Sequence, residues 1–314
     1  MKRIQISMAA ALLMMSAAVF AQKGDLEGQG QAILTVLPSH PAEQDASLTM
    51  AQVQVKVNGK QASVTALTPL KGADDRLEIV LLIDGSIRLS MWEQSGDITK
   101  FIDEAPSDAK ITIAYMQSGQ AALAGPLSSD SAAVLRGLHM TGGSPGSNGS
   151  PYFCLSDLAK RWPSGDRGAR RVVVMITDGV DEFDRSVDPE DPYMQAAIND
   201  SVRAGVTVYS MYWHDQGRAS NTGRATVSGQ NLLQQVTQAT GGNSYWQGDG
   251  NAVSFAPYFE DLRSRLRNQF ALSFSADFKG KPEVVSMKVK ASTPAAKVTA
   301  PQFVYLVHAA VAAQ

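Results

Sequence analysis

Four short apolar segments, separated by longer stretches with helical patterning, constrain the fold of this chain more than any other feature. The segments are nearly continuous runs of apolar or β-branched residues at 77–83, 111–116, 172–177 and 206–212. Such runs are typical of strands buried on both faces. The clearest helical stretch, residues 255–266, repeats large apolar residues at spacings of four, three and four. The alternation predicts an α/β fold with a Rossmann-like, doubly wound, mostly parallel sheet over residues 77–274.

Both ends of the chain have a strand pattern instead. Apolar residues alternate from 32 to 67, around an Asn58-Gly59 pair that is a strong hairpin signal. Alternation returns near residue 270 and continues in segments punctuated by proline. We expect residues 32–67 to pair with or pack against residues 284–307, so that the flanks form one small β-sandwich. The predicted organisation is a signal peptide at 1–21, a flexible leader and β-rich segment at 22–76, the α/β domain at 77–274 and a C-terminal β-rich segment at 275–314.

The first 21 residues have the pattern of a secretory signal peptide. Lys2 and Arg3 precede an apolar run at 8–20, and Val19 and Ala21 stand at positions that a signal peptidase reads. The run is shorter than the roughly 20 residues of a membrane-spanning helix. The sequence therefore predicts an exported protein, periplasmic or secreted, with no membrane insertion after signal removal.

Charge and cysteine usage exclude several classes of protein. Lys and Arg number 28 against 30 Asp and Glu, so a formal net charge of −2 gives no electrostatic case for a nucleic-acid partner. Cys154 is the single cysteine, which excludes an intramolecular disulfide and a thiolate metal cluster. Its apolar neighbours favour a small buried residue over a catalytic nucleophile.

Polar side chains follow two of the apolar segments at the point where each ends. Asp84 is followed by Ser86, and Asp178 is preceded by Thr177. Ligands of open α/β sheets bind beyond the carboxyl ends of the strands, so these residues are candidates for a site. A purely structural role is the alternative, because Asp after a strand commonly caps a helix or accepts from turn amides. Ser150 before Pro151 likewise has the pattern of a helix N-cap.

These motifs, in this order, resemble the von Willebrand factor type A (VWA) domain. The resemblance is carried by Asp84-Gly85-Ser86 after an apolar strand, the Gly-Gly loop ahead of the helix at Pro151, and the run from Val172 to Gly179. The segment from Gly241 to Tyr245, followed by an amphipathic helix, is similar to exported bacterial members. The resemblance covers roughly residues 77 to 274.

The resemblance implies a metal-ion-dependent adhesion site (MIDAS), in which oxygen ligands from three loops hold a divalent cation. Carried over residue by residue, the ligands are Asp84, Ser86, Ser150 and Asp178, with Ser150 in the position of a Thr. Oxygen ligands suit Mg²⁺, Mn²⁺ or Ca²⁺.

Arg88 stands where the family pattern has a second Ser, so the site is degenerate. An arginine lacks the oxygen ligand that the second Ser supplies. Its guanidinium can neutralise the carboxylates of Asp84 and Asp178 in place of a cation. We therefore predict weak or absent binding of divalent metals. The alternative is that Arg88 turns into solvent and the remaining oxygens, with waters, hold Mg²⁺.

The function predicted from these observations is a non-catalytic, adhesion-type module that recognises a secreted or cell-surface protein, or a second copy of this chain. The predicted partner-binding rim consists of Arg88, Ser144, Ser147, Asp181 and His214. The alternative is a hydrolase-like enzyme that uses the rim residues His214 and Asp215. Signature motifs of serine hydrolases, zinc proteases and P-loop enzymes are missing. The acidic residues between 178 and 191 lack the order of a helix-loop-helix calcium site and predict a solvated loop.

Overall fold

The structure is a computed structural model of the chain. It describes residues 26–39, 47–72, 75–86, 89–141, 149–181, 183, 190–214, 223–248, 250–293 and 296–309. The predicted signal peptide therefore lies outside the described residues. Within the described ranges, no helix has both the length and the apolar character needed to cross a membrane.

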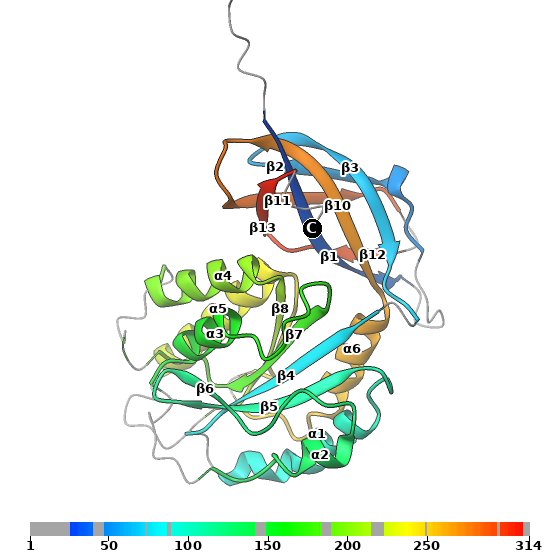
Figure 1. The fold of residues 1–314 in the computed structure, drawn as a ribbon. Coiled ribbons are helices and arrows are strands. Elements are labelled where there is room, and N and C mark those ends of the chain that lie inside the picture. Colours follow the sequence, from blue (N-terminus) through cyan, green and yellow to red (C-terminus); the bar gives the residue numbers. More distant parts are fainter. Residues whose placement is uncertain are drawn as a thin grey trace, which may run out of the picture.

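The described residues form two units, a β-barrel and a sheet covered by helices on both faces (Figure 1). The barrel contains strands from both ends of the chain. They are β1 (Leu26–Pro38), β2 (Val53–Val57), β3 (Lys60–Pro69), β10 (Gln269–Phe278), β11 (Glu283–Ala291) and β13 (Phe303–His308), with β12 (Ala296–Thr299) alongside β1 and the short helix η1 (Met50–Gln52) before β2.

The barrel closes because β1 pairs along both of its edges. The strand order of the barrel is β10-β3-β2-β11-β13-β1. β1 also pairs with β10, in a register that runs from Leu26↔Phe278 to Thr35↔Gln269. Every pair is antiparallel, and alternate side chains point into an apolar interior that includes Leu34, Val55 and Phe274. The predicted pairing between the two flanks of the chain is present, since β2 pairs with β11 and β1 with β13.

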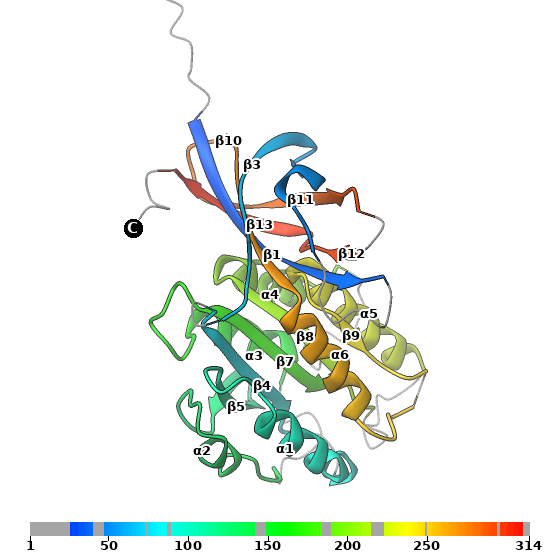
Figure 2. The same cartoon turned by 90° about the vertical axis from the view of Figure 1, so that its right-hand side faces the viewer.

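The fold class predicted from the sequence is wrong. Strands predominate, and the flanks form a closed six-stranded antiparallel barrel rather than a β-sandwich beside a doubly wound parallel sheet. Closure follows from the 13-residue length of β1, which lets one strand join two edges that would otherwise stay open. The predicted boundary after residue 274 falls inside β10, and α6 (Ala256–Arg267) leads almost directly into this barrel strand (Figure 2).

The second sheet is mixed, with the order β6-β5-β4-β7-β8-β9 and an antiparallel edge strand β6. Its strands are β4 (Leu77–Asp84), β5 (Lys110–Gln117), β6 (Gln120–Leu123), β7 (Arg170–Thr177), β8 (Val206–Tyr212) and β9 (Ser244–Tyr245). All eight residues of β4 are buried, as expected for a strand covered on both faces. The four apolar segments of the sequence thus all form strands, namely β4, β5, β7 and β8.

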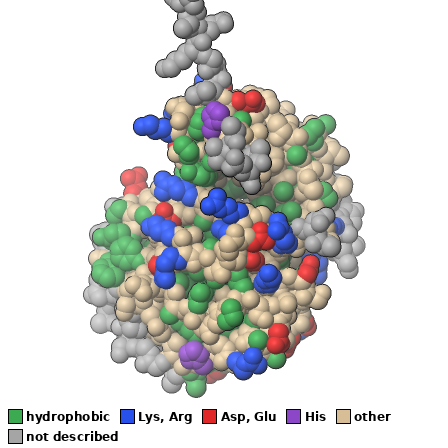
Figure 3. All heavy atoms as spheres, viewed as in Figure 1, with side chains coloured by type: hydrophobic (Ala, Val, Ile, Leu, Met, Phe, Trp, Pro, Cys, Tyr) green, Lys and Arg blue, Asp and Glu red, His purple; other side chains and the backbone are tan. Residues whose placement is uncertain are grey.

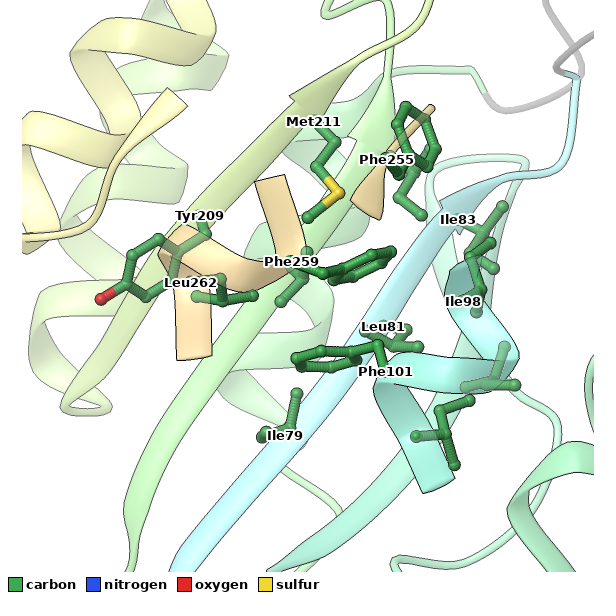
Figure 4. Packing of buried hydrophobic residues seen from close by; sticks show 14 of the residues in the cluster. Ile79, Leu81, Ile83, Ile98, Phe101, Tyr209, Met211, Phe255, Phe259 and Leu262 are labelled. Carbon is green, nitrogen blue, oxygen red and sulfur yellow. The ribbon is translucent and has the colours of Figure 1, made fainter. Parts of the chain in front are cut away.

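Helices cover both faces of this sheet. One face carries η2 (Leu89–Gln94), α1 (Ser95–Asp103), α2 (Ser131–Leu135) and α6, and the other carries α3 (Pro151–Lys160), α4 (Pro192–Arg203) and α5 (Gly223–Thr240). On the first face, the rings of Phe101 and Phe259 stack with centroids 4.5 Å apart, over Ile79 and Leu81 (Figure 4). The apolar face predicted for residues 255–266 is the buried face of α6.

A buried polar cluster joins the two units. Arg170, at the start of β7, pairs with Asp75 and donates to the carbonyl oxygen of Leu266 at 2.8 Å and to Gln269. The Gln269 amide donates in turn to Thr35 Oγ1 at 3.3 Å and to the Tyr209 hydroxyl at 3.1 Å. Burial lowers the pKa of Arg170, and the Asp75 carboxylate opposes that shift. The barrel is therefore held to the mixed sheet by hydrogen bonds as well as by apolar packing.

Candidate functional site

The carboxyl end of β4 is tied to β7 through Asp84. Asp84 Oδ1 accepts from the backbone N–H of Ser86 at 2.9 Å and from its hydroxyl at 2.6 Å, and Oδ2 accepts from Thr177 Oγ1 at 2.9 Å. All three side chains are buried. Asp84 is in this position because β4 and β7 are parallel neighbours whose carboxyl ends meet at the same edge.

Ser150 caps the N-terminus of α3, as its Ser-Pro pattern predicts. Its Oγ accepts from the backbone N–H groups of Tyr152 and Phe153, at 3.3 and 3.4 Å. The same hydroxyl donates to Asp181 Oδ2 at 2.6 Å, and Asp181 Oδ1 accepts from the backbone N–H of Phe183 at 2.8 Å. Asp181 was predicted as a partner contact on the surface, but it is 3% exposed and belongs to this internal network.

Three carboxylates lie close enough to Tyr152 to raise its pKa. Burial is the main cause of that shift, and the charges of Asp181, Asp191 and Asp178 add to it. The Tyr152 hydroxyl donates to the carbonyl oxygen of Gly179 at 2.7 Å, and Asp178 Oδ1 accepts from the backbone N–H of Val180 at 3.0 Å. The carboxyl ends of β4 and β7 therefore adjoin a buried, hydrogen-bonded acidic cluster, defined here as Asp84, Asp178, Asp181 and Asp191.

Three acidic residues and one tyrosine of this region differ from the expectation based on the sequence. The acidic residues between 178 and 191 were expected in a solvated loop, whereas Asp178, Asp181 and Asp191 are all buried. Asp191 caps α4, where its Oδ1 accepts from the N–H groups of Tyr193 and Met194 at 2.7 and 2.9 Å. A signal for this role was present, because Asp191-Pro192 repeats the cap-and-proline pattern of Ser150-Pro151. Tyr152 was missed altogether, since a tyrosine in an apolar helix face carries no separate signal.

The predicted metal ligands Asp84, Ser86 and Ser150 take part in hydrogen bonds within the protein. The Ser150 hydroxyl already accepts two N–H groups, and both oxygens of Asp84 accept from neighbouring hydroxyl or amide groups. Within the described part of the chain, no three His, Cys, Asp or Glu side chains are grouped so as to hold a metal ion. These hydrogen bonds fix the residues that follow β4 and those that begin α3.

The other predicted site residues are described only in part. Arg88, Ser144, Ser147 and Asp215 lie outside the described residues. His214 is half-buried at the end of β8, where its Nδ1 lies 3.0 Å from the Tyr212 hydroxyl and Asn251 donates to its carbonyl oxygen at 3.1 Å. The structure thus describes one member of the His214–Asp215 pair on which the hydrolase alternative depends.

Several exposed apolar side chains belong to segments at the same end of the mixed sheet. Phe183 follows β7, Val227 lies in α5 after β8, and Trp246 and Val253 follow β9. Met140 belongs to the segment that the Tyr115 hydroxyl, near the end of β5, holds by hydrogen bonds to Gly137 and His139. These residues define an apolar rim: Met140, Phe183, Val227, Trp246 and Val253. It holds five of the seven exposed large apolar side chains among the described residues.

Replacement of Ser150 by alanine is expected to lower the free energy of unfolding by about 2–3 kcal/mol, because it removes both a helix cap and a hydrogen bond to a carboxylate. Ser150→Thr keeps the hydroxyl and is the matched control. Urea denaturation of both variants measures the difference. Equal midpoints for the alanine and threonine variants would show that the hydroxyl carries neither interaction.

The Cys154 thiol is expected to be unreactive in the folded protein at pH 8. It is fully buried, and burial, with smaller effects from Asp84 and Asp157, raises its pKa to about 12. Since an unfolded thiol has a pKa of about 8.5, this group stabilises the fold below that pH and loses the contribution as pH rises toward 12. Modification by Ellman's reagent should be at least about a hundredfold slower without urea than in urea. Equal rates would contradict the burial.

Comparisons with known proteins find partial structural likeness. No protein-family model matches the sequence, and no curated protein matches it. The chain is similar to the solved structure of an aerotolerance-related membrane protein from Bacteroides fragilis, at 16% identity and a TM-score of 0.43 over 60% of this chain and 98% of that chain. It is similar to the VWA domain of SpRpn10, at 10% identity and a TM-score of 0.39 over 60% and 93%. Proximal thread matrix protein 1 from the mussel byssus, with a zinc-occupied MIDAS motif, is similar at 13% identity and a TM-score of 0.41 over 65% and 48%.

Proposed function

We propose that this chain is an exported, non-catalytic, VWA-like module that binds a partner protein at the apolar rim. The observation that carries the proposal is that five exposed apolar side chains belong to segments at the carboxyl ends of the mixed sheet. Scattered exposed apolar residues are ordinary, but a group around one edge of a sheet is typical of an interaction surface. The partner is a secreted or cell-surface protein, or a second copy of this chain.

The buried acidic cluster supports this role by fixing the loops beneath the rim. Ser150 joins the start of α3 to Asp181, and Asp84 joins the ends of β4 and β7. The ring of Phe183, two residues beyond Asp181, packs edge-on against Phe153 with centroids 5.2 Å apart. Described residues held in this way, such as Asp181 and Phe183, lose little conformational entropy on binding, which favours affinity. We include Arg88, Ser144 and Ser147 in the proposed binding surface because the sequence predicts them as partner contacts.

Binding through the rim is tested by two variants and one matched control. Phe183→Ser and Val253→Ser remove side chains that are 64% and 90% exposed, whereas Met50→Ser removes one that is 49% exposed on the barrel. We expect both rim variants to fold and to retain at most about one tenth of the partner captured by the native protein from a periplasmic or extracellular fraction. Met50→Ser should capture as much as the native protein does.

Self-association of the native protein and of the three variants is measured by sedimentation velocity, since a second copy of this chain is one of the proposed partners. Equal capture and equal association by the rim variants and by Met50→Ser would overturn the proposal. Turnover of a substrate panel that is lost in His214→Ala would instead support the hydrolase alternative.

The proposed module depends weakly or not at all on a divalent metal. Two features support this: Arg88 replaces an oxygen ligand, and the Ser150 hydroxyl is engaged as a cap. Calorimetric titration with Mg²⁺, Mn²⁺ and Ca²⁺ should give no resolvable binding to the native protein and measurable binding to Arg88→Ser. Native affinity equal to that of the variant would contradict the role assigned to Arg88.

A further inference from the structure

A second candidate site lies between the barrel and the mixed sheet, at the opposite end of the sheet from the apolar rim. A cavity of about 400 Å³ is lined by β1 and β13 on the barrel side and by residues at the amino ends of β7 and β8 on the other. This volume is typical of ligand-binding cavities, which measure roughly 300–1,000 Å³. None of the residues assigned to the rim or to the acidic cluster lines it.

The ladder along one edge of β1 is interrupted where the closed barrel faces this cavity. On one edge, β1 pairs with β13 over Gly28–Gly30 and with β12 over Thr35–Pro38. Residues 31–34 between them have no strand partner on that edge, within the described residues. The chain between β12 and β13 bends away toward α5, where the backbone N–H of Gln302 donates to the carbonyl oxygen of Gln238 at 3.3 Å.

The cavity reaches this interruption in the ladder. Ala32 and Val304 are buried residues of β1 and β13 whose side chains face the barrel interior, yet both line the cavity. Peptide groups of β1 at the interruption lack a ladder partner on this edge. An unpaired strand edge offers N–H and C=O groups to an added extended segment.

The charge of the lining favours an anion. Three arginines line the cavity, Arg167, Arg170 and Arg203, and no Asp or Glu does. Arg170 is neutralised by Asp75, and Arg203 lies 3.4 Å from Asp200 on the surface. Arg167 is exposed and makes no ion pair with any described residue. Several Lys and Arg side chains lie along the seam between the two units (Figure 3).

We propose that this cavity binds a short extended peptide segment bearing carboxylates, supplied by a partner protein. Its backbone pairs with residues 31–34 of β1, and its carboxylates accept from Arg167 and Arg203. Its apolar side chains lie against Ile33, Val206 and Tyr305, which line the walls. The inference is independent of the rim, because the two sites share no residue.

The test is fluorescence anisotropy with the mature full chain and a fluorescein-labelled hexapeptide of alternating valine and glutamate. We expect saturable binding, weakened at least tenfold by Arg167→Glu and several-fold by Arg203→Gln. Arg136→Glu changes an exposed arginine outside the cavity and should leave the affinity unchanged. Phe183→Ser should also bind normally, which separates this site from the rim.

Two further probes examine the assigned occupant. A valine–lysine hexapeptide should not bind, and a backbone N-methylated acidic peptide should bind at least tenfold more weakly, since it cannot pair with β1. Absence of saturable binding by the acidic peptide, or equal affinity for native protein and Arg167→Glu, would overturn the proposal. Equal affinity for the N-methylated and the unmodified acidic peptide would also overturn the proposal. Binding of dodecanoate in place of the peptide would overturn it too, and would identify a lipid-like ligand.

Discussion

Gly242→Ala is expected to lower the free energy of unfolding by about 3 kcal/mol or more, enough to leave much of the chain unfolded at moderate temperature. A Cβ added at Gly242 would lie 1.8 Å from the carbonyl oxygen of Val208 and 2.7 Å from its carbonyl carbon. Both atoms belong to the backbone of β8 and cannot rotate away. Gly242 also donates to the carbonyl oxygen of Thr237 at 2.8 Å, which fixes the turn between α5 and β9.

Gly96→Ala is the matched control for this prediction. Gly96 lies in α1, and a Cβ added there meets nothing within 4 Å. Alanine should therefore be neutral or stabilise by up to about 1 kcal/mol, because it is the better helix former. Urea denaturation followed by circular dichroism compares the two variants. Equal midpoints would mean that the close approach of Gly242 to β8 is absent in solution.

Local patterns predicted the elements of the mixed sheet well. Each of the four apolar segments forms a strand, because continuous burial on both faces requires nearly every residue to be apolar. Ser150-Pro151 likewise predicted the start of α3, since capping depends on a few adjacent residues. The barrel was not predicted, because alternation identifies a strand without identifying its partners. The alternation of apolar residues in β10 is compatible with a strand of the barrel and with an edge strand of the mixed sheet.

The interior of the candidate site likewise depends on contacts that local sequence patterns do not reveal. Asp181 was expected at the surface because an acidic residue in an acidic stretch is usually solvated. Its burial depends on Ser150, 31 residues away, whose hydroxyl donates to it. The seam between the two units gives a stronger case, since Arg170 contacts Asp75 and Gln269 at separations of 95 and 99 residues. No pattern within a local window contains such a contact.

Arg170→Met is expected to lower the free energy of unfolding by about 3–5 kcal/mol, because it leaves Asp75 without its cation at a largely buried position. The side chain of Arg170 is 5% exposed and that of Asp75 is 14% exposed. The change also removes the hydrogen bond to Leu266 of α6 and the one to Gln269 of β10, which joins the barrel to the mixed sheet. The two units should then unfold in separate transitions, each with a smaller dependence on urea than the single transition of the native protein.

Arg161→Met is the matched control, since Arg161 forms an ion pair with Asp157 but is 61% exposed. Water and salt screen that pair, so its loss should cost no more than about 1 kcal/mol. Urea denaturation at two salt concentrations separates the cases: added salt should shrink the effect of Arg161→Met and leave that of Arg170→Met almost unchanged. If the two variants unfolded with the same midpoint and in one transition, Arg170 would be an ordinary surface charge. The attachment of the barrel would then depend on apolar packing alone.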